Sequence, residues 1–236
     1  MTDDKDMQAA AAAKTVWRSR GYLPHYEDLD KSQSITFRLA DSLPRKVLDQ
    51  MELELETLPK ERQAPERRRR IEEWLDAGSG CCALRHPAVA GTVQDTLLRF
   101  EGDRYRLLAW CIMPNHVHVL IEPQESLAKI VQSWKSFTGR WAMQRNAELG
   151  LGVPGKSFWM REYWDRFIRD QKHFNSVIDY IHQNPVKARL CKQAANWPWS
   201  SARLERATHP GNAEHQLGQI MEREIKANTR NPREGN

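Results

Sequence analysis

Two apolar segments joined by a very short connection constrain the fold of this chain more than any other feature. Residues 105–113 and 117–121 are strongly apolar, and the turn-forming pair Pro114 and Asn115 stands between them. Apolar segments connected so tightly favour an antiparallel hairpin, and a hairpin that is apolar on both faces belongs in the interior of a sheet. We therefore predict a buried β-hairpin at 105–121.

The other periodic patterns supply the remaining elements of a compact core. Residues 34–40 alternate apolar and polar side chains, which predicts a half-buried strand, and apolar residues within 44–55 and 126–146 recur at helical spacing. A strand at 158–169 and a helix at 171–183 follow. This order, β-α-β-β-α-β with one appended helix, predicts an α+β protein with a ferredoxin-like core.

The length of 236 residues suits one domain with extensions. We predict a flexible basic N-terminal arm at 1–20, one folded domain at 21–201 and a polar C-terminal tail at 202–236. The charged, proline-containing region at about 59–104 is predicted to be a helical insertion into that domain.

The distribution of charge favours a polyanionic partner. The formal net charge is +5, and residues 126–190 contain eleven Lys or Arg against five Asp or Glu, a local excess of six positive charges. The same segment is rich in aromatic residues, and such a mixture suits a groove that follows phosphates and stacks unpaired bases. The alternative is an ordinary arrangement in which the aromatic residues form core and the charges are solvated.

The cysteines and the N-terminal sequence bear on the compartment. Cys81, Cys82, Cys111 and Cys191 show no C-x-x-C spacing, so we expect reduced thiols. The chain begins with the acidic sequence MTDDKD, unlike a secretory signal, and it has no apolar stretch of the roughly 18 residues that a membrane span requires. These features predict a cytoplasmic protein without a membrane partner.

His116 and His118 are the sharpest local candidate site. In a strand, residues two apart face the same side about 6–7 Å apart, so both imidazoles could bind one metal ion while Val117 faces the core. An H-x-H sequence is common and often binds no metal. Here, however, two polar rings stand in an apolar hairpin, where they need a compensating interaction. We therefore predict a metal-binding pair.

Tyr180 and Asn184 form a second candidate group. On a helix, residues four apart project from one face at neighbouring turns, and this face is offset from the apolar stripe of the predicted helix. A tyrosine at the polar edge of a helix is usually a packing residue. The spacing alone leaves a structural role and a catalytic role open.

Several motifs in order along the chain resemble one family. The string WCIMPNHVHVLIEP resembles the H-U-H motif of tyrosine transposases, in which two histidines flank a bulky hydrophobic residue. The string REYWDRFIRDQKHFNSVIDYIHQNPVKARL resembles the later block of REP-associated tyrosine transposases, and GYLPH, TFRLADSLP and NWPWSS are also similar to that family. The resemblance extends over about residues 21–201.

The resemblance implies an active site and a reaction. It makes His116 and His118 ligands of Mg²⁺ or Mn²⁺, with Asn184 where the family has a Gln or Asn as third ligand. It makes Tyr180 the nucleophile, whereas Tyr163 falls in a strand segment that suggests packing. The implied activity is cleavage and strand transfer of single-stranded DNA at hairpins of palindromic REP-like repeats, through a 5′-phosphotyrosine intermediate.

The same resemblance implies a partner and a location. The expected partner is single-stranded DNA folded into a hairpin, bound by a nucleoid-associated protein that is a monomer, with a homodimer as the alternative. The positions expected to contact the DNA are Arg18, Arg20, Tyr22, Lys135, Arg140, Arg161 and Lys187.

Two other functions stay open at this point. One is a DNA-binding protein with reduced catalysis that acts in repression or repeat maintenance, although a pure binding protein needs no set of His116, His118, Tyr180 and Asn184. The other is a metal phosphoesterase that uses an activated water, with a structural Tyr180. A covalent protein–DNA adduct would distinguish a tyrosine transposase from both.

Overall fold

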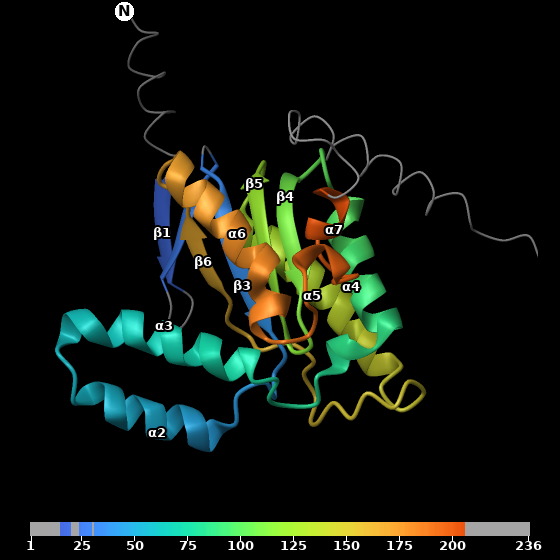
Figure 1. Cartoon of the computed structure of the whole chain (residues 1–236), viewed down its shortest axis with the longest axis horizontal. Coiled ribbons are helices and arrows are strands. Elements are labelled where there is room, and N and C mark those ends of the chain that lie inside the picture. The colour runs from blue at the N-terminus through green and yellow to red at the C-terminus, as the bar shows by residue number, and fades with distance from the viewer. Residues whose placement is uncertain (1–14, 20–23, 30, 206–236) are drawn as a thin grey trace, which may run out of the picture.

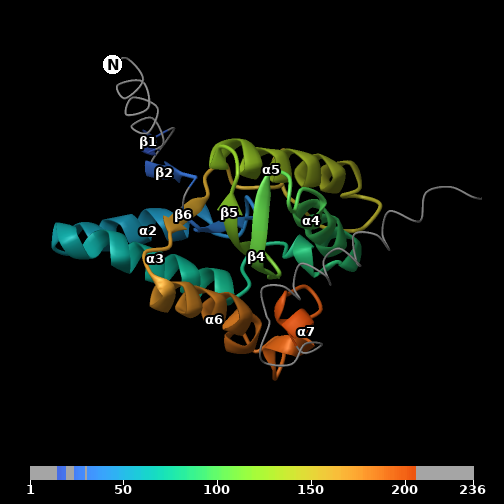
Figure 2. The same cartoon turned by 90° about the horizontal axis from the view of Figure 1, so that it is seen from above.

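A four-stranded antiparallel sheet forms the centre of the protein (Figure 1). The computed structural model describes residues 15–19, 24–29 and 31–205. The strands, in their spatial order, are β4 (Tyr105–Ile112), β5 (His116–Pro123), β3 (Gln33–Arg38) and β6 (Trp164–Phe167). Every pair of neighbours is antiparallel. Helices α4 (Pro87–Arg99) and α5 (Leu127–Gln144) lie together on one face (Figure 2), which completes the predicted ferredoxin-like α+β core.

The predicted hairpin is confirmed. β4 and β5 pair along their lengths, and the Met113 N–H donates to the His116 carbonyl at 2.8 Å across the turn. A register shift between Leu107 and Ala109 marks a bulge in β4. β5 also pairs with β3, so it is an interior strand, and its residues 116–121 are all buried.

One face of the sheet and the two helices on it enclose the main core. Ile35 and Phe37 point to this face because alternate residues of a strand face opposite sides. The Phe37 ring lies between Trp134 and Trp159, at centroid distances of 6.1 and 4.8 Å. The buried Trp134 N–H donates to the Tyr105 hydroxyl at 2.9 Å. This packing fixes β3 and β5, and with them the opposite face, which carries the histidines.

The appended helix α6 (Gln171–Lys187) covers the other face of β4 and β5 (Figure 2). Cys111 and Leu120 on that face pack against Ile181 of the helix. We expected the helix to end before Pro185, but it continues through that residue. Pro185 has no N–H to donate to the Ile181 carbonyl, and the helix ends two residues after it.

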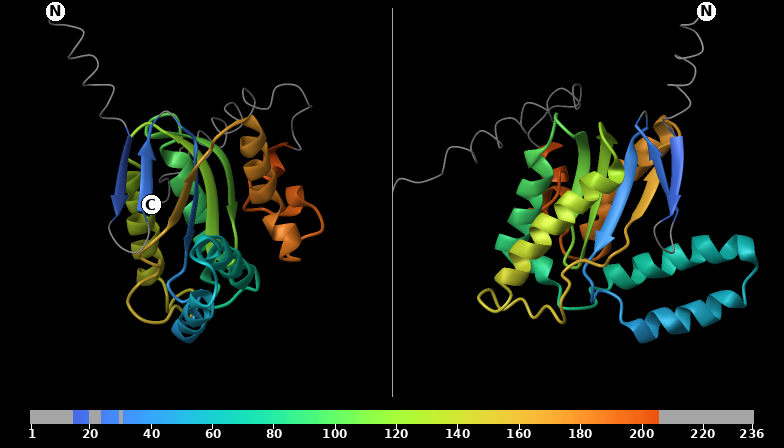
Figure 3. Two further views of the ribbon diagram at one scale, coloured as in Figure 1. Left: turned by 90° about the vertical axis from the view of Figure 1, so that its left-hand side faces the viewer. Right: turned by 180° about the vertical axis from the view of Figure 1, so that it is seen from behind.

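A helical hairpin projects from one end of the sheet (Figures 1 and 3). Helices α2 (Arg45–Glu56) and α3 (Lys60–Asp76) pack together around a small separate core that includes Leu55, Ile71 and Leu75. The insertion predicted at about 59–104 is therefore misplaced. The hairpin occupies 45–76, and α4 fills the first helical position of the ferredoxin-like core. Both α2 and α4 are amphipathic, so periodicity did not show which of them meets the sheet.

Both ends of the described chain differ from the prediction. β1 (Thr15–Ser19) and β2 (Pro24–Asp28) form an antiparallel hairpin beside β6, so part of the predicted flexible arm is a strand. Short helices complete the described chain: η1 (Ala83–Arg85), η2 (Ala194–Asn196) and α7 (Ala202–Glu205). Leu204, inside the predicted polar tail, is buried in the main core. Within the described ranges, no helix has the length and apolar character of a membrane span.

Candidate active site

His116 and His118 lie side by side on the face of β5 that looks toward α6. Their side chains are 1% and 3% exposed, their Nε2 atoms are 2.9 Å apart, and their rings meet edge to face at a centroid distance of 4.7 Å. Val117 between them points into the main core on the opposite side. The two imidazoles therefore converge on one point.

The outer nitrogens of both rings are held by neighbouring side chains. His116 Nδ1 is 2.7 Å from Asn115 Oδ1, and His118 Nδ1 is 2.9 Å from Thr36 Oγ1. The Asn115 oxygen can only accept, so His116 carries its proton on Nδ1 and presents an Nε2 lone pair to the other ring. Asn115 Nδ2 donates in turn to the Ser79 carbonyl at 2.9 Å. Such partners hold an imidazole in the orientation that a metal ligand requires.

Burial keeps both rings neutral. It lowers the pKa of His116 well below the usual range, and the neighbouring His118 adds to this effect. It lowers the pKa of His118 to about 3, with further contributions from the charges of Arg68 and Lys187. The nitrogen lone pairs are therefore available at neutral pH, and neutral imidazole is the form that binds metal.

Tyr180 faces the histidine pair from α6. Its ring packs edge to face against His118 at a centroid distance of 5.3 Å, and Lys187 Nζ lies 5.0 Å from the centroid of the same ring. Burial raises the pKa of Tyr180 above its usual range, and the carboxylates of Glu72 and Asp76 raise it further. The resting phenol is therefore protonated.

Asn184 lies one helical turn after Tyr180 and is fully buried. Its Nδ2 donates to the Tyr180 carbonyl at 2.8 Å, whereas its Oδ1 has no hydrogen-bond partner among the described residues. A buried amide oxygen without a partner is costly and needs an explanation. Neutral imidazoles and an amide oxygen are kinds of donor that a divalent cation accepts. Clusters of three His, Cys, Asp or Glu are absent from the described ranges, so a three-ligand site here requires the amide.

Arg38 is a buried cation on the same face, and no sequence motif indicates its role. It stands opposite His116 in the register of β3 and β5 and is 5% exposed. Its guanidinium donates to Ser42 Oγ at 3.1 Å and lies 5.6 Å from the ring centroid of Trp164. Burial lowers its pKa to about 10, and no carboxylate pairs with it in the described part of the chain. A buried guanidinium without an acidic partner favours an anionic ligand.

One face of α3 completes the surroundings of the tyrosine. Arg68, Glu72 and Asp76 recur at intervals of four and therefore share a face of the helix. Arg68 and Glu72 line a small cavity together with Thr36 and Trp164. Burial, reinforced by Glu72, raises the pKa of Asp76 from 3.8 to about 6. The spacing of Arg68, Glu72 and Asp76 in the sequence indicates that they share a helix face, but the sequence around them does not show which residues that face contacts.

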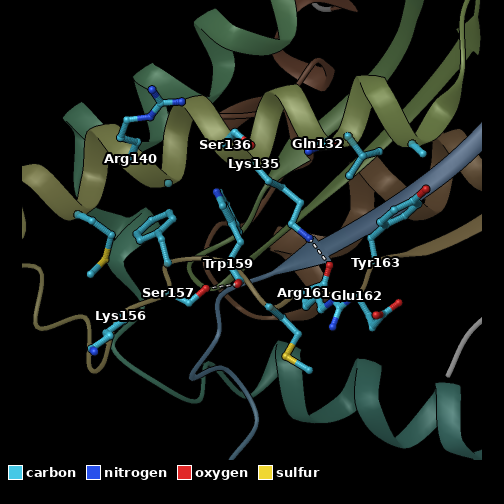
Figure 4. A pocket seen from close by; sticks show the side chains of 16 residues that line it. Gln132, Lys135, Ser136, Arg140, Lys156, Ser157, Trp159, Arg161, Glu162 and Tyr163 are labelled. Carbon is cyan, nitrogen blue, oxygen red and sulfur yellow. Dashed lines mark hydrogen bonds between the residues drawn. The ribbon is translucent and has the colours of Figure 1, made fainter. Parts of the chain in front are cut away.

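Three of the residues predicted to contact DNA lie together. Lys135, Arg140 and Arg161 line one cleft between α5 and residues 156–163, on the α5 side of the sheet (Figure 4). Tyr163, the competing tyrosine, lines this cleft and not the histidine site.

The other predicted contacts are dispersed. Lys187 lies against Tyr180 at the histidine site. Arg18 belongs to β1, paired with His25 in the backbone register, but its side chain is outside the described part of the structure. Arg20 and Tyr22 also lie outside the described residues.

Comparison with known families defines the class of protein to which this site is similar. Residues 93–184 match the family described as Transposase IS200 like, and this segment contains both histidines, Tyr180 and Asn184. The segment that builds most of the candidate active site is thus similar to IS200-like transposases.

Individual relatives confirm the predicted resemblance to REP-associated tyrosine transposases. The chain is 26% identical over 111 residues to the REP-associated tyrosine transposase of Escherichia coli (strain K12), a match that covers 46% of this chain and 62% of the relative. A Haemophilus influenzae protein that is provisionally named as a REP-associated tyrosine transposase is 29% identical over 114 residues. This match covers 43% of this chain and 61% of the relative. The chain thus spans about three fifths of the length of these relatives. A solved structure of a REP-associated tyrosine transposase bound to a REP hairpin is 19% identical, covers 81% of this chain and 89% of that one, and has a TM-score of 0.44.

Proposed function

We propose that this protein is a metal-assisted tyrosine transposase that cleaves and rejoins single-stranded DNA at hairpins of REP-like palindromic repeats. The observation that carries the proposal is the contact between the Tyr180 and His118 rings, whose centroids are 5.3 Å apart. His118 is in turn paired with His116, and the two Nε2 atoms are 2.9 Å apart. The matched family and the relatives named REP-associated tyrosine transposase support DNA as the substrate.

His116, His118 and Asn184 would hold the metal ion. Imidazole ligands make Mn²⁺ at least as suitable as Mg²⁺, which prefers oxygen. When bound, the ion supplies positive charge that stabilises the non-bridging oxygens of the reacting phosphate. The Asn184 Oδ1 atom supports this assignment, because a cation would satisfy an oxygen that has no partner in the described structure.

Tyr180 is the proposed nucleophile. Its hydroxyl oxygen bonds to phosphorus and loses its proton, the bond from phosphorus to the 3′ oxygen breaks, and that oxygen takes up a proton. The products are a 5′-phosphotyrosyl enzyme and a free 3′-hydroxyl, and the reverse attack by a 3′-hydroxyl rejoins the strand without ATP. Lys187, 5.0 Å from the Tyr180 ring centroid, and Arg68, whose charge lowers the pKa of Tyr180, favour loss of the phenol proton. Arg38, opposite His116, adds positive charge for binding of the phosphate.

One copy of the chain carries all four residues of the proposed site. β5 supplies the two histidines and α6 supplies Tyr180 and Asn184, so all four residues come from the same copy of the protein. This arrangement supports a monomer acting on one hairpin, and a homodimer would bring two such sites together.

The test uses a 3′-labelled hairpin DNA with single-stranded flanks, because the downstream fragment is the one expected to remain on the enzyme. With Mn²⁺ or Mg²⁺, a labelled band at the mobility of the protein should appear on a denaturing gel. Tyr180→Phe removes only a hydroxyl and should abolish the band, whereas Tyr163→Phe, the matched control, should keep it. DNA binding without an adduct under every metal would favour the binding protein with reduced catalysis. Cleavage that survives Tyr180→Phe would favour an activated water.

A further inference from the structure

A cleft of about 600 Å³ lies between α5 and the segment at 156–163, and we name it the α5 cleft (Figure 4). One side is formed by the outward face of α5 from Ala128 to Met143, and the other by the extended chain from Lys156 to Tyr163. Pockets of about 300–1,000 Å³ accommodate ligands of nucleotide size. The residues that line the α5 cleft do not include the two histidines, Tyr180 or Asn184, and no chemical step of the reaction described above takes place there.

Positive charge predominates in the α5 cleft. Lys135, Arg140, Lys156 and Arg161 line it, against one carboxylate, that of Glu162. Arg140, Lys156 and Arg161 are exposed, and none of them forms an ion pair within the described ranges. A concave surface with this excess of cations attracts a polyanion, and binding releases the counterions that the polyanion carries.

The wall and floor of the α5 cleft are aromatic. Tyr163 is partly exposed on the wall, and Lys135 Nζ lies 6.0 Å from its ring centroid while donating to the Arg161 carbonyl at 2.6 Å. Trp159 lies on the floor against Gly139, where an added Cβ would come within 3.1 Å of the Trp159 ring. Cations beside aromatic rings are the combination that binds unpaired nucleotides, through phosphate contacts and base stacking.

The edge strand β6 connects the α5 cleft with the active-site face. Residues 156–163 run directly into β6, the last strand of the four-stranded sheet, beside which the β1–β2 hairpin lies. Tyr163 lines the α5 cleft, whereas the next residue, Trp164, lies beneath α3 with its ring near Arg38. Burial lowers the pKa of Lys135 to about 8; the charge of Glu162 opposes this shift and the charge of Arg38 adds to it. A DNA strand that follows the chain from Tyr163 to Trp164 could therefore contact both surfaces.

We propose that the α5 cleft binds unpaired nucleotides that flank the hairpin on the strand to be cleaved. The phosphates lie against Lys135, Arg140 and Arg161, and a base packs on Tyr163. This assignment rests on the proposed function, because it takes DNA as the substrate. It adds a second DNA-binding surface, so that the substrate is held on both faces of the sheet.

The test compares the affinity of the protein for one hairpin with and without a single-stranded flank, measured by fluorescence anisotropy. The unaltered protein should bind the flanked hairpin at least about tenfold more tightly. The double variant Arg140→Glu, Arg161→Glu should lose this gain and keep its affinity for the unflanked hairpin within about twofold. Its salt dependence for the flanked hairpin should fall by about 1.4 in log–log slope, because each single-strand phosphate contact contributes about 0.7. Ser136→Leu, which fills the α5 cleft without changing its charge, should also reduce the gain.

Lys129→Glu is the matched control. Lys129 is an exposed cation on α5 that does not line the cleft, so this variant should keep the gain from the flank. The inference is overturned if the flank brings no gain to the unaltered protein, if the cleft variants keep the gain, or if dAMP competes at the same concentration as the flank oligonucleotide. Failure of every form to bind either hairpin would instead contradict the proposed function.

Discussion

Replacement of Thr36 by valine should weaken metal binding about tenfold and leave the fold intact. The Thr36 hydroxyl is 2.9 Å from Nδ1 of His118, so when Nε2 of that ring binds a cation, the Nδ1–H group donates to the hydroxyl. Valine has nearly the same shape but cannot accept this hydrogen bond. Loss of such a partner costs about 10- to 100-fold in metal affinity. Because Thr36 is only partly buried, water can replace part of the interaction. We therefore expect a loss of metal affinity at the lower end of this range, about tenfold, which corresponds to about 1.4 kcal/mol of binding free energy.

The assay is isothermal titration of the protein with Mn²⁺, alongside thermal unfolding without metal. Thr36→Ser keeps the hydroxyl and should bind within about twofold of the unaltered protein, whereas Thr36→Val should show the full loss. The unfolding measurement separates this effect from general destabilisation, which should not exceed about 1–3 kcal/mol. Equal Mn²⁺ affinity in the valine variant and the unaltered protein would refute the reasoning, as would equal losses in the serine and valine variants.

Three more variants test other parts of the structure. Asn184→Leu should abolish Mn²⁺ binding and change the free energy of unfolding by no more than about 1 kcal/mol, because removal of a buried oxygen without a partner in the described structure offsets loss of the Nδ2 hydrogen bond to the Tyr180 carbonyl; retained binding with a large loss of stability would contradict this. Since the pKa of Asp76 is raised from 3.8 to about 6, the fold favours the protonated carboxyl, and this stabilisation is complete below about pH 4 and lost as the pH rises through about 6. Asp76→Asn should therefore flatten the fall of the thermal midpoint between about pH 5 and pH 8, and an unchanged pH profile would count against the assignment. Phe37→Ala should lower the free energy of unfolding in urea by about 3–5 kcal/mol, because its ring is 1% exposed between Trp134 and Trp159, and a loss below about 1 kcal/mol would show that the site collapses around the cavity.

The parts of the site that depend on local sequence could be predicted from it. The β4–β5 hairpin follows from two apolar segments and a turn within one short window, and strand alternation brings His116 and His118 to one face. The contact between His118 and Tyr180 is different, because helical spacing shows which residues share a face but not which side of a sheet the helix covers. That contact was expected only from the family resemblance.

The remaining features depend on packing between distant segments. Arg38 and Thr36 reach the histidines only through the register of β3 with β5. Glu72 and Asp76 of α3 act on Tyr180 across the tertiary fold, because α2 and α3 pack together as a hairpin apart from the main core. The sequence did not predict this hairpin, because the amphipathic pattern of α2 is similar to that of α4. In the same way, the sequence predicts Lys135 and Arg161 as separate DNA contacts, and only the tertiary fold shows that they line one cleft.

The identity of the residue that becomes bonded to DNA tests the central claim most directly. After reaction with a flanked hairpin and Mn²⁺, digestion with protease and nuclease should leave a nucleotide phosphate on the bonded residue, and peptide mass spectrometry locates it. We predict this modification on the peptide that contains Tyr180 and none on the peptide that contains Tyr163. A nucleotide on any other residue, or complete cleavage of the DNA without a modified peptide, would contradict the account.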